Sequence, residues 1–251
     1  MKILIIADIH SNLEALKETF LYIKKIKMNI SRTFVLGDII GYGPFPNECI
    51  DFVKNLSNCT CTPGNHEWAL LGKMPISYFN ENAKQAILWT KKVLTKNNRD
   101  YILYNLPMTE KLEYDDMEYL FLHGSPTNKI EEYIVNPYIA KKNFKEFDEN
   151  VCFFAHTHVP MMYMSDKNEV TSLYLEDGII FKLDHDIKYL INIGSIGQPR
   201  DGDPRASFGI LDTSTKKLTI KRIDYDYAKT QKYIMKAGLP EILASRLAWG
   251  R

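Results

Sequence analysis

The chain has 251 residues, 45% hydrophobic and 25% charged, so it is long enough to bury a substantial core. Its 32 basic and 31 acidic residues nearly cancel, which gives no signal for nucleic acid or an anionic membrane as a partner. No apolar stretch approaches the roughly 20 residues of a membrane span, and the first apolar run is too short for a signal peptide. Because the four cysteines also lack the paired C-x-x-C spacing of structural zinc sites, we expect a cytoplasmic protein with reduced thiols.

The first part of the chain alternates between strand and helix patterns. Apolar or β-branched runs predict three buried strands, at residues 2–7, 33–38 and 59–65. Asn12 is expected to cap a helix whose apolar residues recur at i, i+3, i+7 and i+10, and Asn47 to open a second helix through Leu56. This alternation predicts an α/β fold with a parallel sheet.

The remaining elements are shorter and carry more turn signals. Helices are expected at residues 79–95 and 99–105 and from Asn136, a hairpin at residues 111–124, and a buried strand at residues 151–155. Residues 160–223 read as antiparallel strands with turns at residues 166–168, 177–178 and 213–215. Residues 226–248 are expected to be helical, with a break at residues 238–240. Because we find no repeat or linker, we expect a single domain over residues 1–251.

Polar side chains collect where the expected strands end. Ligands of an α/β sheet bind at the carboxyl ends of its strands, so we expect these side chains to meet. The alternative, a chance set of buried core histidines, would not usually place so many at strand ends. His185 is the exception, because it lies in an apparent exposed turn and is expected to be solvated. The set is Asp8, His10, Asp38, Asn65, His66, His123, His156 and His158.

The residue types in this set predict a metal site. Aspartate, asparagine and histidine without a thiolate suit Mn²⁺, Fe or Zn²⁺ better than Ca²⁺ or Mg²⁺. The set has too many potential ligands for one catalytic ion with an open position, so it predicts two divalent ions that share a carboxylate. Two metals about 3.5–4 Å apart clamp an oxyanion and convert a bridging water into hydroxide. That arrangement is suited to the hydrolysis of phosphoesters.

The order of the motifs resembles that of the calcineurin-like metallophosphoesterases. The stretches "GDIIGYGPFPNECID" and "NIGSIGQPRDGDPRASFGILD" also resemble the small bacterial and archaeal phosphoesterases of this superfamily. The resemblance covers most of the chain and implies a four-layer α/β/β/α sandwich with a central two-sheet core and a dinuclear metal site at strand ends. The motifs are D-x-H at residues 8–10, G-D at 37–38, G-N-H-E at 64–67, the lone His123 and H-x-H at 156–158.

The resemblance also implies a role for each matching residue. The first metal would be held by Asp8, His10 and His158. The second would be held by Asn65, His123 and His156, with Asp38 bridging the two. His66 would not be a ligand but the catalytic residue that faces the substrate and donates a hydrogen bond to the phosphate or the leaving group.

The loop after Asp38 departs from the phosphoprotein phosphatases of the superfamily, which carry an aspartate and an arginine there. Gly41 and Tyr42 occupy that stretch, so the phosphate-gripping arginine and the aspartate that would orient the catalytic histidine are missing. Close kinship with the protein phosphatases is therefore disfavoured. Two smaller departures are Ala155, where a glycine usually precedes H-x-H, and Ile193, where a proline is usual.

Two arginines are candidates to replace the missing one. Arg200 follows the glycine-rich stretch and Arg205 comes next, and a guanidinium fork suits phosphate. The alternative for Arg200 is a surface ion pair with Asp201 or Asp203.

Tyr42 and Phe45 are expected to form a wall over the metals, because they lie on an irregular loop rich in glycine and proline. A nucleobase or another flat group would stack on such a wall, which favours nucleotide-type substrates. Tyr78, Phe79 and Trp68 lie further on, and for Phe79 and Trp68 we expect packing under a helix.

The sequence therefore predicts an enzyme, a metal-dependent phosphoesterase whose partner is a small phosphorylated substrate. Its cofactors would be two divalent transition-metal ions, and the sequence leaves the oligomeric state open. One alternative is a non-catalytic scaffold of the same fold, but a scaffold would be expected to lose a ligand and none is lost. A protein phosphatase or a nuclease is a further alternative, and the balanced charge gives a nuclease no support.

Overall fold

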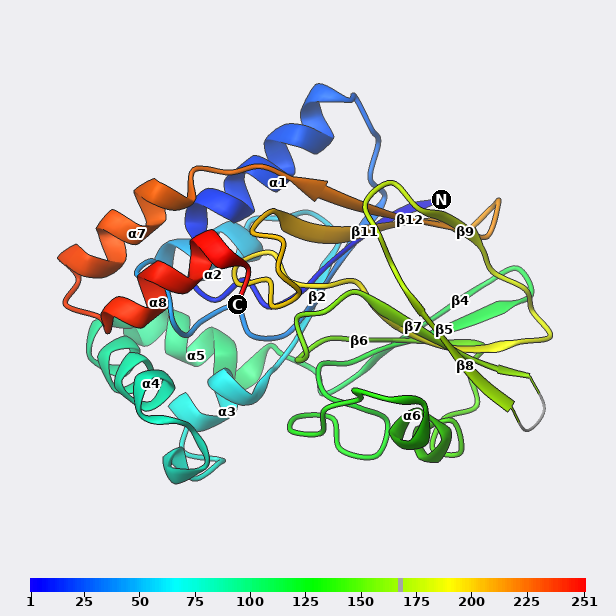
Figure 1. The fold of residues 1–251 in the computed structure, drawn as a ribbon, viewed down its shortest axis with the longest axis horizontal. Helices are drawn as coiled ribbons and strands as arrows, with labels where there is room; N and C mark the ends of the chain where they lie inside the picture. Colours follow the sequence, from blue (N-terminus) through cyan, green and yellow to red (C-terminus); the bar gives the residue numbers. More distant parts are fainter. Residues whose placement is uncertain (167–168) are drawn as a thin grey trace.

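Two six-stranded β-sheets pack face to face in the computed structural model, which describes residues 1–166 and 169–251 (Figure 1). Each sheet joins strands that are far apart in the sequence. The first sheet has the order β3 (Cys59–Thr62), β2 (Arg32–Leu36), β1 (Lys2–Ile6), β11 (Ala206–Asp212), β12 (Lys217–Ile223) and β9 (Ile180–Lys182). The second has the order β4 (Glu110–Tyr114), β5 (Met117–Phe121), β6 (Val151–Phe154), β10 (Lys188–Asn192), β7 (Met161–Asp166) and β8 (Glu169–Tyr174).

Helices cover the outer faces of the two sheets. Figure 1 shows α1 and α6 on opposite sides of the sheets, and α7 packs against α1 and α8. None of the helices in the described part of the chain combines the length and apolarity that crossing a bilayer requires. The helices are α1 (Leu13–Lys25), α2 (Pro46–Lys54), α3 (Asn65–Leu70), α4 (Glu81–Val93), α5 (Lys96–Tyr104), α6 (Pro137–Asn143), α7 (Tyr227–Lys236) and α8 (Glu241–Ser245), with 3₁₀ turns η1 (Ile76–Tyr78) and η2 (Arg246–Trp249).

Strand β1 shows why its sequence is an uninterrupted apolar run. Ile3 and Ile5 lie in the core between the two sheets, whereas Leu4 and Ile6 pack on the opposite face against α1 and α2. A strand buried on both faces has no polar side to alternate with. Each such side chain contributes roughly 1.5–3 kcal/mol by leaving water. A third apolar cluster packs α6 on the outer face of the second sheet, which confirms the expected four-layer sandwich.

The helix starts partly match the expectations. Asn12 caps α1 by accepting a hydrogen bond from the backbone of Ala15 at 3.3 Å, as expected. By contrast, α2 begins at Pro46 rather than Asn47. The Asn47 side chain instead accepts from the backbone of Thr95 and donates to that of Val93, both at 2.9 Å, and so ties α2 to the connection between α4 and α5.

Two further expectations need correction. The strand expected at residues 59–65 ends at Thr62. Asn65 is not part of it but begins the short helix α3, which was not expected. Strand β10 pairs parallel to β6, with Tyr189 opposite Val151, so residues 160–223 are not purely antiparallel. The turn expected at residues 166–168 includes residues 167–168, which lie outside the described residues.

Candidate metal centre

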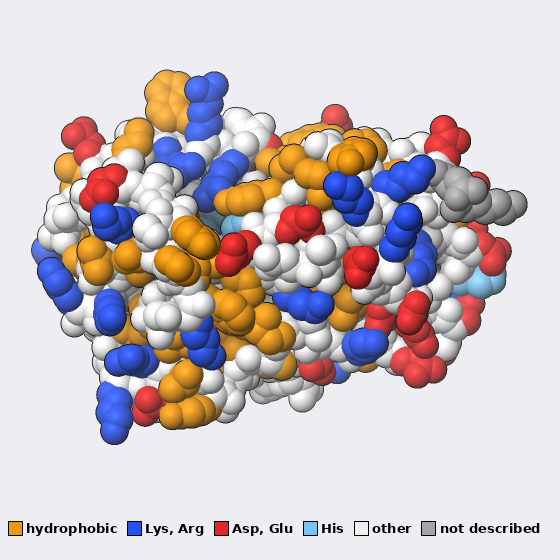
Figure 2. All heavy atoms as spheres, turned by 90° about the horizontal axis from the view of Figure 1, so that it is seen from below, with side chains coloured by type: hydrophobic (Ala, Val, Ile, Leu, Met, Phe, Trp, Pro, Cys, Tyr) orange, Lys and Arg blue, Asp and Glu red, His pale blue; other side chains and the backbone are white. Residues whose placement is uncertain are grey.

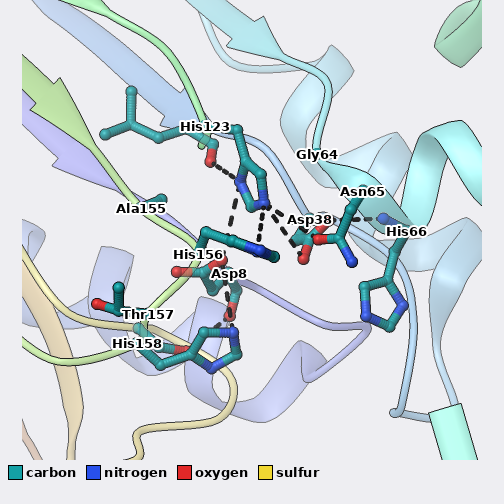
Figure 3. A network of polar contacts seen from close by, with 12 residues as sticks. Asp8, Asp38, Gly64, Asn65, His66, His123, Ala155, His156, Thr157 and His158 are labelled. Carbon is teal, nitrogen blue, oxygen red and sulfur yellow. Dashed lines mark hydrogen bonds and ion pairs between the residues drawn. The ribbon is translucent and has the colours of Figure 1, made fainter. Parts of the chain in front are cut away.

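The polar residues that follow the strands converge on one buried cluster (Figure 3). The carboxylates of this cluster follow β1 and β2 of the first sheet, and three of its histidines follow β5 and β6 of the second. The ligand atoms form two groups that share Asp38, and within each group they lie within 4.8 Å of one another. The groups are Asp8, His10, Asp38 and His158, and Asp38, His123 and His156.

One ring nitrogen of each of these histidines is bound to a backbone carbonyl. A neutral imidazole has one N–H, so the nitrogen that bonds the carbonyl donates and the other keeps its lone pair for a metal. His156 is turned the other way from its neighbours and leaves Nδ1, not Nε2, facing the cluster. The contacts are His10 Nδ1 to Ile40 O (3.1 Å), His123 Nδ1 to Leu36 O (2.8 Å), His158 Nδ1 to Gln198 O (2.5 Å) and His156 Nε2 to Glu131 O (3.2 Å).

The remaining nitrogens meet in two pairs. His10 Nε2 lies 3.1 Å from His158 Nε2, and His123 Nε2 lies 3.2 Å from His156 Nδ1. Since each ring already donates its N–H to a carbonyl, both atoms of a pair present lone pairs to each other. A cation between them removes that repulsion. Asn65 joins the second pair, because its Oδ1 is 3.2 Å from His123 Nε2.

The Asp8 carboxylate also requires a positive partner. It is fully buried, and neither of its oxygens has a hydrogen-bond partner. Burial and the nearby charge of Asp38 raise the pKa of Asp8 well above its usual value. A buried carboxylate without a partner is strongly disfavoured, so the donor set fits a divalent cation.

Asp38 lies between the two groups. Its Oδ2 is 3.6 Å from both His10 Nε2 and His123 Nε2, and its Oδ1 accepts a hydrogen bond from the backbone of His66 at 3.0 Å. Burial raises the pKa of Asp38 to about 7, although that hydrogen bond and the charge of Arg200 act in the opposite direction. This carboxylate is therefore within reach of both groups of candidate ligands.

The histidines of the cluster are neutral at pH 7. Burial lowers the pKa of every one of them, to about 4 for His123, and nearby positive groups lower several further. Neutral imidazole is the form that binds metals, so no proton has to leave these rings at neutral pH.

Five predicted ligands have backbone in the left-handed region, with φ between 47° and 69°. Non-glycine residues rarely adopt that region, and each such residue costs roughly 1–3 kcal/mol. Strain of this kind concentrates at functional sites. The five are Asp8, His10, Asp38, His156 and His158.

His66 lies beside the cluster but belongs to neither ligand group. Its ring packs edge-on against Tyr42 and Phe79, with ring centroids 4.6 and 5.2 Å away, and its buried Nδ1 has no hydrogen-bond partner. Gly41 lies directly under this nitrogen, since a Cβ at Gly41 would stand 2.2 Å from it. Among the described residues no aspartate bonds this nitrogen, and the packing of the neighbouring rings holds the imidazole.

Glu67 is a fully buried residue that the sequence reasoning missed. Its carboxylate accepts hydrogen bonds from the backbone of Asp38 (2.9 Å), Ile40 (3.1 Å) and Gly64 (2.8 Å), so it joins the two loops that carry Asp38 and Asn65. The sequence pattern that could have identified Glu67 is its position three residues after the residue that caps α3, which is the spacing of a capping box.

The two predicted phosphate-binding arginines have different environments. Arg200 Nη2 contacts Gln198 Oε1 at 3.0 Å and the Tyr42 hydroxyl at 3.4 Å, next to the cluster. It does not form the alternative surface ion pair, because the neighbouring Asp201 is bound by the buried Arg222. Arg205 instead forms ion pairs with two carboxylates, at 2.7 and 3.0 Å, so its guanidinium is not free to bind phosphate.

The aromatic wall is built from other residues than expected. Tyr42 packs against the ring of His10 at 4.6 Å, but Phe45 packs into the helix-covered core and against Tyr233, away from the cluster. Tyr133, which the sequence reasoning missed, stacks on His156 at 3.8 Å and is 44% exposed. No sequence pattern marks Tyr133, because it lies in an irregular segment between β5 and α6.

A cleft of about 190 Å³ opens beside the candidate metal ligands. Figure 2 shows a hollow in which a histidine is visible, with Lys or Arg side chains at one edge and hydrophobic side chains at another. The cleft is lined by the metal-ligand candidates Asn65 and His156, by the aromatic residues Tyr42, Tyr78, Phe79 and Tyr133, and by Met74, Asn80, Ala83 and Glu131. His185 lies far along the chain from these residues in an exposed turn, as expected.

The model of the calcineurin-like phosphoesterase family matches residues 1–160, which carry every predicted metal ligand. The chain belongs to this family. An uncharacterized protein of Methanocaldococcus jannaschii is 42% identical over 250 residues, covering 99% of this chain and 98% of its own. The crystal structure of a metallophosphoesterase from Sphaerobacter thermophilus is 39% identical, covers 100% of this chain and 99% of its own, and superposes with a TM-score of 0.85.

A hypothetical protein of Pyrococcus horikoshii shares the fold at 21% identity, with a TM-score of 0.81 over 100% of this chain and 98% of its own. Both structural similarities extend over the whole chain, so the C-terminal helices α7 and α8 belong to the shared architecture. The family uses divalent metal ions, and the buried cluster of aspartates and histidines is able to hold them.

Proposed function

We propose that the protein is a dinuclear metal-dependent phosphoesterase that acts on small substrates. The observation that carries the proposal is the pair of facing imidazole nitrogens in each of two groups, joined by the single carboxylate of Asp38. Two divalent transition-metal ions, of which Mn²⁺ is our first choice, would stabilise charge on the phosphoryl oxygens and supply a nucleophile from water at neutral pH.

The residues around the cluster have separate tasks in this proposal. The first ion is held by Asp8, His10 and His158, the second by Asn65, His123 and His156, with Asp38 bridging. His66 is a catalytic residue that donates an N–H to the leaving group. Because burial lowers its pKa, it acts as a neutral imidazole.

Arg200 binds the phosphate. Its side chain lies near the cluster, since its charge acts on both Asp8 and Asp38. Among the described residues its guanidinium has no carboxylate partner, so the fork is available to an incoming anion.

The cleft favours substrates with a flat group. Tyr78 and Tyr133 line it and are 70% and 44% exposed, which leaves their faces open to a ligand. Base–aromatic stacking is worth about 1–3 kcal/mol per base, enough to bias substrate choice. Nucleotides and dinucleoside polyphosphates therefore fit better than phosphoproteins.

The alternative functions have less support. A non-catalytic scaffold does not need an intact ligand set, and here all seven predicted ligands lie in one cluster. A protein phosphatase is disfavoured by Gly41 and Tyr42 in the loop after Asp38. A nuclease is disfavoured by a net charge of +1.

The test is to strip the protein of metal, reload it with Mn²⁺ and assay phosphomonoesters, phosphodiesters, dinucleoside polyphosphates and phosphopeptides. We expect metal-dependent hydrolysis, abolished in Asp38→Asn together with a lower metal content. Asp224→Asn, at an exposed aspartate outside the groups that could hold a metal ion, is the matched control and should change neither the activity nor the metal content. If the loaded wild type binds metal but hydrolyses none of these substrates, the scaffold is the better interpretation.

A further inference from the structure

Two arginines lie against the ring of Tyr42 beside the metal-ligand cluster. The Cζ atoms of Arg200 and Arg246 are each 5.8 Å from its centroid. Arg200 comes from the loop that follows β10, whereas Arg246 comes from η2, so the fold brings them together from distant parts of the chain.

Neither guanidinium is paired with an aspartate or a glutamate within residues 1–166 and 169–251. The other buried or half-buried arginines, such as Arg205 and Arg222, all bind aspartate or glutamate. Arg246 donates its Nε–H to the backbone oxygen of Arg251, and the Nε of Arg200 is buried without a partner.

The two charges disfavour each other. Burial and the charge of Arg200 lower the pKa of Arg246. Like charges at short range and a buried donor without an acceptor both cost free energy, and one anionic ligand would remove both costs.

We propose that Arg200 and Arg246 form an anion subsite that binds a second phosphate of the substrate, adjacent to the one that is cleaved. The proposal rests on the phosphoesterase function and narrows its substrate class to esters or anhydrides with at least two phosphates. The placement of the two arginines supports a cleaved phosphate near Arg200 and a second one near Arg246. The charge of Arg200 opposes the rise that burial causes in the pKa values of Asp8 and Asp38 in the cluster, whereas Arg246 lies against Tyr42. A chain of two phosphates would run from the metals, past Arg200, to Arg246.

The experiment measures how inorganic phosphate and inorganic pyrophosphate inhibit hydrolysis of bis(p-nitrophenyl) phosphate, at fixed free Mn²⁺. In the wild type we expect pyrophosphate to inhibit at the lower concentration. Arg246→Gln should raise the inhibition constant of pyrophosphate roughly ten-fold, because a charge-assisted hydrogen bond is lost, and that of phosphate less than about two-fold. Arg246→Lys keeps the charge and should restore most of the difference.

The matched control is Arg99→Gln, which removes an exposed arginine of α5 and should leave both inhibition constants unchanged. A calorimetric titration of the EDTA-treated protein with pyrophosphate gives a second readout that does not depend on turnover, and Arg246→Gln should weaken that binding as well. If the wild type hydrolyses no diester but does hydrolyse another of the phosphoesters named above, that substrate replaces the diester in the inhibition assay. If it hydrolyses none of them, the proposed function fails, while the titration still tests the subsite. The subsite proposal would be overturned if Arg246→Gln changed the inhibition constants of phosphate and pyrophosphate equally, or left that of pyrophosphate unchanged. Melting curves show whether each variant is folded, and Arg246→Met, which also removes the charge but keeps a long side chain, carries the test if Arg246→Gln is not.

Discussion

His66 differs from the other histidines beside the cluster, because its buried Nδ1 faces no other imidazole nitrogen and no carbonyl. We predict that His66→Asn keeps both ions but slows turnover by roughly 10²–10⁴-fold, because the transition state loses a positioned hydrogen-bond donor. Metal analysis and kcat on the same preparation separate the two effects. Loss of metal in this variant would mean that His66 is a ligand.

Asp8 and Asp38 determine how metal binding depends on pH. Burial raises the pKa of Asp8 well above its usual value and that of Asp38 to about 7, so protons occupy most Asp38 carboxylates of the metal-free protein at pH 6. Binding needs the carboxylate form and must release these protons. We therefore predict that Mn²⁺ affinity rises with pH up to about 7. Titration calorimetry in two buffers of different ionisation enthalpy should detect proton release at pH 6, and no release at that pH would contradict the prediction.

Gly41, in the loop after β2, leaves room for the ring of His66 because it has no side chain. Gly41 has φ +98° and lies under the His66 ring. We predict that Gly41→Ala displaces the ring and lowers kcat more than metal content. Gly72→Ala is the matched control, because Gly72 also has a positive φ (+73°) but nothing within 4 Å of its Cβ position. Equal losses of activity in the two variants would assign the effect to backbone strain alone.

The segments around η1 and between β5 and α6 provide the exposed faces of the aromatic wall. We predict that replacing both Tyr78 and Tyr133 with alanine lowers kcat/KM for a nucleotide more than for a sugar phosphate, because only the nucleotide loses stacking. Tyr104→Ala, at an exposed tyrosine of α5, should leave the ratio of the two kcat/KM values unchanged. An unchanged ratio in the double variant would show that this wall does not select the substrate.

At the scale of the elements, local patterns predicted strands and caps well. The buried runs and the Asn12 cap depend on neighbouring residues, and both are confirmed. The start of α2 was wrong because Asn47 bonds to the backbone of Val93 and Thr95, which lie far along the chain. The parallel pairing of β10 with β6 was missed for the same reason, because contacts between distant parts of the chain determine which strands pair.

At the scale of the whole molecule, both sheets contribute to the metal-ligand cluster. Phe34 of the first sheet stacks on Phe121 of the second with ring centroids 3.7 Å apart, next to the strand ends that carry Asp38 and His123. The predicted ligands were accessible from the sequence because they form ordered motifs at strand ends. Tyr133 and Arg246 come near the site only through packing, and Phe45 leaves it for the same reason, whereas Glu67 had a local signal in its capping-box spacing.

The most direct test of the dinuclear centre is anomalous X-ray diffraction at the manganese edge from crystals of the Mn²⁺-loaded protein. We predict two peaks about 3.5–4 Å apart. One should lie between His10 and His158, the other between His123 and His156, with Asp38 in contact with both. A single peak, or a peak away from these imidazole pairs, would contradict the assignment of two ions bridged by Asp38.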